Sequence, residues 1–589
     1  MKCVKCFADL PQGVRFCPNC GSPQPEPSDA VQLHRLGVAA QERASYTEAE
    51  QYYLKALEAC AGTSEQGSLE QAAIQNDLGG LYFVMGRYAA AEPLYRQALE
   101  IRRSALGPRD PTVASSLSNL GSLHQAAGNP SAALPLLQEA LEIQRATLGE
   151  NHPEVAQTLN NLALAYEEMS DYAAAEPLLT QALEIRRTTL GSSHPDVAQS
   201  LNNLALFYES VGDYARADGL FQEALKIRRA VFGENHPDVA QSLNNLAALH
   251  QSMGDYGAAE QLLRQALEIY RTSLGPQHPY AAQTQRDLAM LLTTQGRYAE
   301  AEPLLREALE IYGASVGRQH SAYTATLESL ASLYQSTDNY GAAEKSLREV
   351  LEIYRAAGDK DSYVARTLYD LGVVVRAQQR FAEAEALLKE CLKVRDKLGD
   401  KAGSAVALEQ LGQIARVSGD PDKARGYYSR SRTIRKSIGD KAGMARTLHQ
   451  MGELALAGED YGAARKYYSQ SLDINQTLGV QSRIAEDLSR LAHVAVKQGD
   501  RGEASHLENQ AKEITGRVKL KDRLVAVLAE QPSESTLRAV CRRLDLKYED
   551  LPGEGPAVKG RELVTWAYQH EQLEQLRILV QEQYPGVTV

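Results

Sequence analysis

The chain has 589 residues, 43% of them hydrophobic, so it is long enough for a repeat array or several domains and disorder is not expected. Its formal net charge of -12 argues against a general nucleic-acid-binding surface, which needs a basic face to displace counterions. The sequence contains no run of about eighteen apolar residues and no apolar signal segment, so we expect a cytoplasmic protein without a membrane span.

Four of the seven cysteines lie within the first twenty residues. They form two Cys-x2-Cys pairs, Cys3 with Cys6 and Cys17 with Cys20. Four thiolates at this spacing can hold one Zn2+ tetrahedrally at about 2.3 Å per sulfur, in a closed site that is structural rather than catalytic. A redox-active dithiol or a pair of disulfides is the alternative interpretation.

The second cysteine pair lies in Cys17-Pro-Asn-Cys20-Gly21, which closely resembles the zinc-ribbon family, whereas Phe7 follows the first pair where Gly is usual. The resemblance implies a zinc ribbon at residues 1–22 with one structural zinc ion. A Pro-rich linker at 23–28 follows it. The partner of the ribbon stays open, because members of that family contact nucleic acid or protein.

From residue 29 to about 515 the chain repeats itself. An anchor position recurs every 42 residues through Tyr340, then once after 41 residues and thereafter every 40. Alanine stands three residues after every anchor, and Leu, or Met451 in one copy, stands ten residues before it. The anchors are Tyr46, Tyr88, Pro130, Tyr172, Tyr214, Tyr256, Tyr298, Tyr340, Phe381, Pro421, Tyr461 and Arg501.

A helix–turn–helix unit explains this pattern. The first helix, helix A, ends at a turn such as Gly212-Asp213, and the second, helix B, ends at a pair such as Leu190-Gly191, where Gly can cap the helix. The small alanine allows the two helices to cross closely. Because one such hairpin cannot bury its own apolar face, the sequence predicts an all-α superhelical solenoid of about twelve stacked repeats.

These positions resemble the tetratricopeptide repeat family, whose Leu, Gly or Ala, Tyr, Ala, Phe or Tyr, and Ala positions match throughout the array. The 42-residue units, with Thr158 to Tyr166 as an example, look like kinesin light chain repeats. The 40-residue units, with Ile438 to Gly443 as an example, look like other bacterial signalling arrays. A kinesin partner is not implied, because the sequence has no heptad coiled coil of the kind that binds the motor in that family.

Carboxamide side chains recur on helix A of the central repeats, and in three repeats they form pairs four residues apart that share one helix face. They are Asn119, Gln157, Asn161, Gln199, Asn203, Gln241 and Asn245. In the tetratricopeptide repeat family, helix A lines the concave face that holds extended peptides. Amides offer donors and an acceptor, so this ladder can pair with a peptide backbone. Alternatively, the amides bond between neighbouring helices and hold the superhelix together.

One histidine per central repeat precedes a proline at the start of helix A. These residues are His152, His194, His236 and His278. Stacked repeats would separate them by about 10 Å or more, too far to share a metal ion at bond lengths of about 2 Å. We therefore expect them to cap helices rather than to bind a metal.

The period breaks after Lys512, and residues 517–589 are expected to form a separate helical bundle. Apolar spacing predicts helices near Leu520–Leu528, Glu534–Leu544, Val558–His570 and Gln572–Gln583. The segments from Leu537 to Gly555 and from Lys559 to Val564 resemble bacterial effector-associated, death-like domains. The resemblance implies an adaptor that associates with similar domains on effector proteins.

The two halves of this module carry opposite charge. Residues 517–547 hold eight Lys or Arg and four Asp or Glu, whereas residues 548–589 hold three and seven. Opposite faces suit head-to-tail association between like domains. The expected basic face comprises Arg538, Arg542 and Arg543, and the acidic face comprises Glu549, Asp550 and Glu554. An ordinary mixed-charge surface is the alternative.

The sequence contains no P-loop, no Gly-x-Ser-x-Gly motif and no Cys and His in a matching context, so we expect no enzymatic activity. The favoured function is an adaptor in bacterial signalling or defence, whose groove binds a protein partner and whose C-terminal module recruits an effector. The alternative is an assembly scaffold tethered through the zinc ribbon, with a link to nucleic acid, in which the C-terminal bundle only caps the array.

Overall fold

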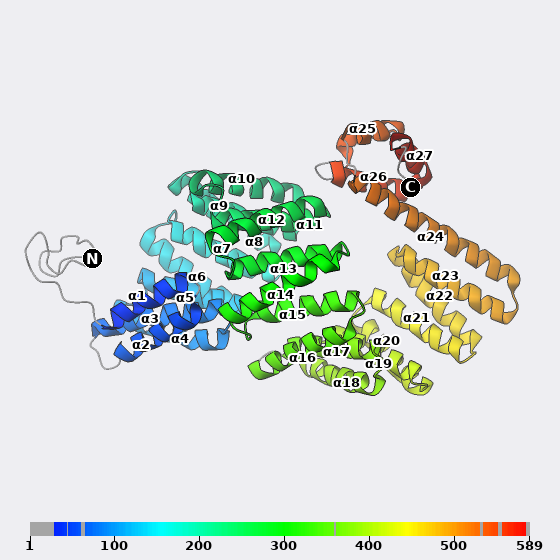
Figure 1. The fold of residues 1–589 in the computed structure, drawn as a ribbon, viewed down its shortest axis with the longest axis horizontal. Coiled ribbons are helices and arrows are strands. Elements are labelled where there is room, and N and C mark those ends of the chain that lie inside the picture. The colour runs from blue at the N-terminus through cyan, green and yellow to red at the C-terminus, as the bar shows by residue number, and fades with distance from the viewer. Residues whose placement is uncertain are drawn as a thin grey trace, which may run out of the picture. The chain divides into compact units, whose positions relative to one another are not determined.

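The computed structural model describes residues 29–43, 45–60, 65–358, 361–530, 534–551 and 556–584. Within these ranges the regular elements are all helices, α1 to α27 and one short 3-10 helix (Figure 1). The all-α repeat fold expected from the sequence is therefore confirmed. The predicted zinc ribbon and linker, with Cys3, Cys6, Cys17 and Cys20, lie outside the described residues.

The chain divides into two compact units. The first comprises residues up to Leu249 with Leu262–Gln285 and Glu307–Tyr323, and the second comprises His250–Gln261, Arg286–Arg306 and the chain from Thr324. The first ten helices belong to the first unit. They are α1 (Asp29–Glu42), α2 (Tyr46–Cys60), α3 (Glu65–Val84), α4 (Tyr88–Leu106), α5 (Pro111–Ala126), α6 (Pro130–Leu148), α7 (Pro153–Glu168), α8 (Tyr172–Leu190), α9 (Pro195–Ser210) and α10 (Tyr214–Phe232).

The next five helices each contribute residues to both units. They are α11 (Pro237–Ser252), α12 (Tyr256–Ser273), α13 (Pro279–Thr294), α14 (Tyr298–Ser315) and α15 (Ser321–Ser336). The remaining elements belong to the second unit. They are α16 (Tyr340–Ala357), α17 (Asp361–Ala377), α18 (Phe381–Leu398), α19 (Lys401–Val417), α20 (Pro421–Ser437), α21 (Lys441–Ala457), α22 (Tyr461–Leu478), α23 (Gln481–Gln498), α24 (Arg501–Glu530), α25 (Glu534–Arg543), η1 (Tyr548–Asp550), α26 (Pro556–Gln569) and α27 (Leu573–Gln583).

Every predicted anchor is the first residue of a helix B, from Tyr46 at the start of α2 to Arg501 at the start of α24. The alanine three residues later is fully buried in the first eleven repeats, and Ala504 is nearly so. The Leu or Met ten residues before the anchor is also buried, except Leu36, which is 48% exposed. The close crossing of helices A and B expected from the alanine is therefore confirmed.

Glycine replaces alanine on helix A where an aromatic ring of helix B crosses it. Gly452 faces Tyr468, and a Cβ atom at Gly452 would lie 2.6 Å from Cε1 of that ring. Gly412 and Tyr428 form the equivalent pair one repeat earlier, with 2.5 Å between the same atoms. Large and small side chains thus interlock across each of these hairpins.

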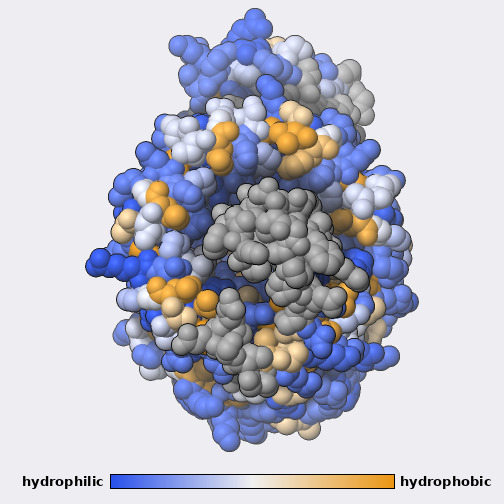
Figure 2. All heavy atoms as spheres, turned by 90° about the vertical axis from the view of Figure 1, so that its left-hand side faces the viewer, coloured by the Kyte–Doolittle hydropathy of each residue, from blue (hydrophilic) through white to orange (hydrophobic). Residues whose placement is uncertain are grey.

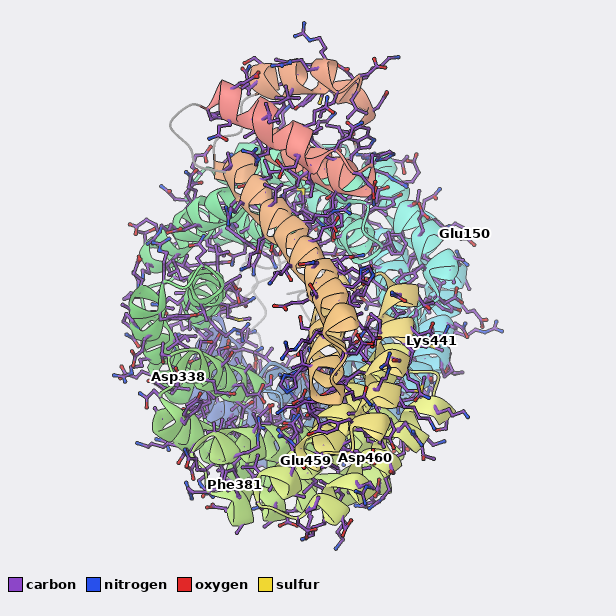
Figure 3. All side chains as sticks on the ribbon, turned by 90° about the vertical axis from the view of Figure 1, so that its right-hand side faces the viewer. Glu150, Asp338, Phe381, Lys441, Glu459 and Asp460 are labelled. Carbon is purple, nitrogen blue, oxygen red and sulfur yellow. The ribbon has the colours of Figure 1, made fainter. Side chains whose placement is uncertain are left out.

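The turn from helix A to helix B passes through a left-handed residue. Glycine supplies it in most repeats, but Ser170, Asp338, Gln379 and Glu459 have φ values between 56° and 63° there. Asp338 and Glu459 are labelled in these connections in Figure 3. A non-glycine residue in this region costs about 1–2 kcal/mol, so these four turns are strained relative to the others.

Histidines cap helix A as the sequence predicts. The Nδ1 atom of His152 accepts a hydrogen bond from the backbone N–H of Glu154 at 3.2 Å, and His194 does the same for Asp196 at 3.1 Å. His236 and His278 repeat the bond at 3.2 Å. The proline after each histidine occupies the first helical turn, where its missing N–H costs nothing.

The array and the C-terminal bundle share α24, which is 30 residues long. The boundary predicted at residues 515–517 falls inside this helix. The period breaks because the buried side chains change from Ala504 and Ala511 to Leu524 and Leu528, while the backbone remains helical. α25, α26 and α27 correspond to the other predicted helices, and their apolar side chains form a separate core around Leu528, which includes Leu537, Leu563 and Leu576.

Apolar side chains are scattered over the surface. On the face drawn in Figure 2 they occur as small groups among hydrophilic residues. Isolated apolar residues of this kind are normal for a folded protein. In the part of the chain that the structure describes, no helix has both the length and the apolar character needed to cross a membrane.

Candidate functional site

An amide-bearing face runs along helix A of three successive repeats in the first unit, on α7, α9 and α11. On α7, Gln157 is exposed and Asn161 is half-buried. Leu164 follows Asn161 by three residues, lies on the same side of the helix and is 38% exposed. Leu206 repeats this arrangement on α9, also 38% exposed, after Asn203. We call these amides and leucines the amide face.

The amides pair with each other along each helix. Gln157 donates from Nε2 to Asn161 Oδ1 at 3.1 Å, and Gln199 donates to Asn203 at 3.0 Å. These bonds fix the directions of the carboxamides. Because a carboxamide has two N–H donors and an oxygen with two lone pairs, each pair keeps capacity for a further ligand.

Other bonds of the same amides join neighbouring repeats. Asn119 donates to Asn76 at 2.8 Å, and Asn161 donates to Ser122 at 3.3 Å. Asn245 likewise donates to Asn202. Bonding between helices, the alternative considered for these amides, therefore exists in the structure, and the groove role remains a prediction that is compatible with it.

Two buried arginines, which were not predicted from the sequence, donate hydrogen bonds to glutamines of the amide face. Arg186 of α8 donates from Nη2 to Gln157 Oε1 at 2.7 Å and from Nη1 to Ser200 Oγ at 3.0 Å. Arg228 of α10 makes the same bonds one repeat later, to Gln199 at 2.9 Å and to Ser242 at 2.9 Å. Burial lowers the pKa of both arginines.

A periodic signal for these arginines does exist in the sequence. They stand fourteen residues after the anchor, and a Ser or Thr follows another fourteen residues later. The same pair appears as Gln144 with Thr158, bonded at 2.7 Å. A polar residue that recurs within an otherwise apolar helix face indicates a buried hydrogen bond.

The amide face carries no positive charge of its own. α7, α9 and α11 contain no Lys or Arg, whereas their first and last turns contain acidic residues such as Glu154 and Glu168. Burial and the neighbouring Glu167 raise the pKa of Glu168. The face therefore suits a neutral or basic segment better than an acidic one.

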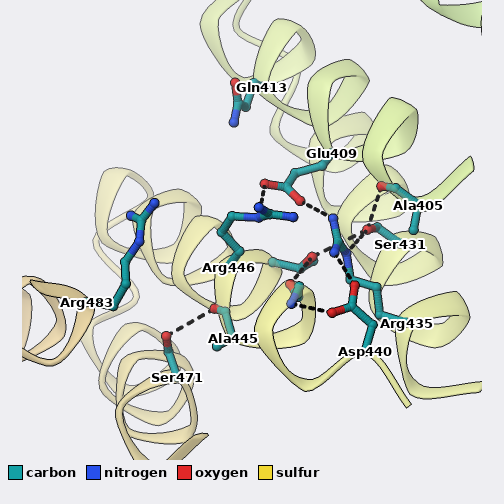
Figure 4. A network of polar contacts seen from close by, with 12 residues as sticks. Ala405, Glu409, Gln413, Ser431, Arg435, Asp440, Ala445, Arg446, Ser471 and Arg483 are labelled. Atoms are coloured by element: carbon teal, nitrogen blue, oxygen red, sulfur yellow. Dashed lines mark hydrogen bonds and ion pairs between the residues drawn. The ribbon is translucent and has the colours of Figure 1, made fainter. Parts of the chain in front are cut away.

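The helices α19 and α20 of the second unit present a different chemistry, dominated by ion pairs (Figure 4). Arg435 of α20 is 1% exposed and contacts Glu409 of α19 at 2.7 Å and Asp440 at 2.6 Å. It also donates to Ser431 at 3.3 Å. Burial raises the pKa of Glu409, although Arg435 and Arg446 act in the opposite direction.

A second buried network lies between α21 and α23. His449 contacts Asp487 through Nδ1 at 2.7 Å, and Asp487 accepts from Ser471 and from Asn475 at 2.8 Å each. On α17, burial raises the pKa of Asp370 to about 6. Because these groups are bonded or buried within the repeats, they belong to the interior of the array rather than to an open site.

The charged residues predicted for the C-terminal association surface pair within the bundle. Arg538 contacts both Glu534 and Glu549, and Arg543 contacts Glu582. Arg538 holds the pKa of Glu549 below its usual range. Arg538 and Glu549 are therefore neighbours, so the expected basic and acidic faces meet at this pair.

Three other members of that predicted surface differ from each other. Arg542 is exposed and donates to the backbone oxygen of Arg538 at 3.3 Å. Asp550 is exposed at the end of η1. Glu554 lies outside the described residues.

Comparison with known families identifies the array. The tetratricopeptide repeat profile matches residues 29–104, 70–146, 112–188, 196–272, 259–314, 323–397 and 403–477, which together make up more than half of the chain. The chain belongs to the tetratricopeptide repeat family. None of the matched segments includes residues 1–28 or 478–589, so the ribbon and the effector-associated domain remain predictions. No curated protein matches the sequence significantly.

Several solved structures are similar. One is a Podosopora anserina protein described as a kinesin light chain with nearly identical TPR-like repeats; it is 29% identical over 35% of this chain and 97% of its own, with a TM-score of 0.30. BtubC (BKLC) of P. vanneervenii is 27% identical over 41% and 92%, with a TM-score of 0.32. Aspartyl phosphate phosphatase F of Bacillus subtilis is 14% identical over 62% and 94%, with a TM-score of 0.40. The matches to the tetratricopeptide repeat profile include both 42-residue and 40-residue units of the array.

Proposed function

We propose that this tetratricopeptide repeat protein is a non-enzymatic adaptor in bacterial signalling or defence. Its amide face binds an extended segment of a protein partner, and its C-terminal module recruits an effector by association with a similar domain. The proposal rests on one pattern that repeats on α7 and α9 within a tetratricopeptide array: a solvent-accessible pair of amides followed by an exposed leucine.

The chemistry of the amide face favours an extended backbone as its ligand. The side chains of Gln157 and Gln199 are already oriented by Asn161 and Asn203, so little conformational entropy is lost when they bond to a peptide. Leu164 and Leu206 recur at a spacing of one repeat and offer apolar contacts beside the amides. Affinity would come from the backbone bonds and selectivity from these contacts.

Charge substitution on the amide face tests the first half of the proposal. We expect the double variant Leu164→Glu, Leu206→Glu to lose the partners that the full-length protein captures from its native cells. Neither leucine is fully buried, so the array should remain folded. The control is the double variant Leu106→Glu, Val231→Glu, which adds the same charge at exposed apolar positions on two helices B, α4 and α10. Equal capture by all three proteins would refute the role of the amide face.

The C-terminal module is best tested through Arg542. Arg538 and Arg543 are engaged with carboxylates of the same bundle, whereas Arg542 is exposed and contacts a backbone oxygen. Because α24 is continuous, the full chain should be used rather than a fragment starting at residue 517. We expect Arg542→Glu to abolish capture of a protein with a similar domain and Arg542→Lys to preserve it. Undiminished capture by Arg542→Glu would exclude this face.

We also propose that residues 1–22 hold one structural zinc ion through Cys3, Cys6, Cys17 and Cys20. The two Cys-x2-Cys pairs support this proposal by their spacing. Elemental analysis of the purified chain should find about one zinc per molecule, and the Cys17→Ser, Cys20→Ser variant should contain none. The control is Cys60→Ser, since Cys60 is a buried residue at the end of α2. Zinc retained by the double variant would contradict the assignment.

A further inference from the structure

α20 has an unusual charge for a helix of this array. It contains six Lys or Arg residues and one Asp, although the chain as a whole has a net charge of -12. The helix B before it, α18, has four residues of each sign, and the helix B after it, α22, has two basic residues and one acidic. A concentration of cations on one helix therefore stands out against an acidic background.

Packing decides which of these cations face solvent. Ala424, Tyr428, Ser431 and Arg435 are buried on one side of α20. Arg435 is held there by Glu409 and Asp440 at 2.7 and 2.6 Å (Figure 4). The orientation of the helix about its own axis is thus fixed by a buried ion-pair network, and its other side is displayed in a constant position.

The displayed side carries cations without carboxylate partners. Lys423 and Arg425 are paired, with Glu385 at 3.3 Å and with Asp422 at 2.9 Å. Arg430 and Lys436 are exposed and Arg432 is half-buried, and none of the three forms an ion pair with another described residue. Since a helix turns by about 100° per residue, Arg430 borders the exposed side on one edge and Arg432 and Lys436 border it on the other. We call Arg430, Arg432 and Lys436 together the basic face of α20.

A shallow cavity adjoins this face. Ser429, Arg430, Thr433 and Ile434 line a volume of about 300 Å³. Arg430 supplies a guanidinium group, Ser429 and Thr433 supply hydroxyl groups, and Ile434 supplies an aliphatic side chain. Lys436 lies on the same helix. Such a surface can bind a carboxylate and also contact the methylene groups that bear it.

We propose that the basic face of α20 is a second partner-binding surface, which binds an acidic segment of a polypeptide. We choose an acidic partner on the basis of charge complementarity. Unpaired guanidinium and ammonium groups attract carboxylates and steer their approach. Nucleic acid fits less well: specific binders neutralise about 6–10 phosphates, whereas this face has three free cations on a chain of charge -12. The surface lies on helix B and is separate from the amide face, which lies on helix A.

Binding of a fluorescent poly-L-glutamate peptide to the full-length protein tests this inference. We expect saturable binding that weakens as salt is added, since exposed charges are screened. The triple variant Arg430→Gln, Arg432→Gln, Lys436→Gln should bind about tenfold more weakly, because three surface charge pairs contribute modestly each. The control Arg96→Gln, Lys226→Gln, Arg264→Gln removes the same charge from exposed positions on three other helices B and should bind as the parent protein does.

Each remaining outcome overturns the inference. Equal weakening in both triple variants would show that total charge, not α20, determines binding. A DNA duplex that binds more tightly than poly-L-glutamate, and does so through the same three residues, would replace the acidic polypeptide by nucleic acid. Absence of peptide binding at low salt would refute the proposal that this surface binds an acidic segment. Circular dichroism of each variant establishes that it is folded, and exposed substitutions should leave the helical content unchanged.

Discussion

At the scale of single residues, the helix crossing in a repeat depends on one small side chain that faces a large one. Gly452→Ala would place a Cβ atom 2.6 Å from Cε1 of Tyr468, whose hydroxyl is held by Glu453 at 2.7 Å. We expect this variant to lose about 1–3 kcal/mol of unfolding free energy, as other overpacked cores do. Urea denaturation followed by circular dichroism measures the change.

The control for this substitution is Gly426→Ala on α20, where no atom lies within 4 Å of the added Cβ. Alanine is about 1 kcal/mol better than glycine in a helix interior, so the control should gain stability. If both variants changed stability equally, the contact with Tyr468 would not be the cause.

Asp370 makes the stability of the array depend on pH. Burial raises its pKa to about 6, against the opposing effect of Arg366, while an unfolded Asp has a pKa of about 3.9. The folded chain therefore keeps this proton longer as pH rises. Its contribution is fully present below about pH 4 and is lost between about pH 4 and 6, by up to about 3 kcal/mol.

Asp370→Asn removes this titration. The variant should be more stable than the parent by about 1–3 kcal/mol near pH 7.5 and should have no advantage below about pH 4. Thermal denaturation across this range measures the effect, with the exposed Asp473→Asn as the control. A variant that is destabilised equally at every pH would contradict the burial of a protonated carboxyl.

The role of a residue could be predicted from the sequence where it depends only on the position of that residue within its own repeat. The alanines after each anchor and the caps of His152 and His194 follow from position in the repeat alone, so the sequence was sufficient. A periodic signal exists for Arg186, but the degree of burial of Arg186 and of Asp370 depends on how neighbouring helices pack against them. The cysteine cluster and the amide groove are still predictions, since no contact in the described residues tests them.

At the scale of helices, α20 is fixed by Arg435. Arg435→Ala would leave the buried carboxylate of Glu409 without its partner, so we expect a loss of about 3–5 kcal/mol. The double variant Arg435→Met, Glu409→Met should lose less, because it removes both charges. Urea denaturation of the two variants distinguishes these cases. Equal losses would mean that side-chain packing, not the unpaired charge, dominates.

Helix boundaries were predicted well where a cap or a turn marks them. Each helix B begins at its anchor, because the preceding turn needs a left-handed residue. A boundary near residue 515 was predicted from the change of period, but the continuity of α24 through it was not. From Glu503 to Glu530 the helix contains one glycine, Gly516, and no proline, and one glycine costs about 1 kcal/mol, too little to end a helix.

At the scale of the whole molecule, the C-terminal bundle has a core of its own, and Trp566 beside that core is the only Trp in the chain. Trp fluorescence therefore reports on the bundle, whereas circular dichroism reports chiefly on the array. Leu576 is 0% exposed, so Leu576→Ala should cost about 2–5 kcal/mol. We expect it to lower the denaturation midpoint of the fluorescence signal only. Equal shifts in both signals would show that the two parts unfold as one.

We assign different surfaces of one array to different ligands. The amide face of the first unit is uncharged apart from acidic ends, and the basic face of α20 belongs to the second unit. A tetratricopeptide array separates such surfaces because each repeat contacts chiefly its neighbours. The central claim is that helix A, and not helix B, binds the extended partner.

Photo-crosslinking from single positions in the full-length protein tests that claim most directly. A benzoylphenylalanine side chain replaces Leu206 on helix A of α9 in one variant and Lys226 on helix B of α10 in the other, both exposed positions. We expect irradiation in native cells to link a partner protein to position 206 and not to position 226. Crosslinks from position 226 with none from position 206 would contradict it.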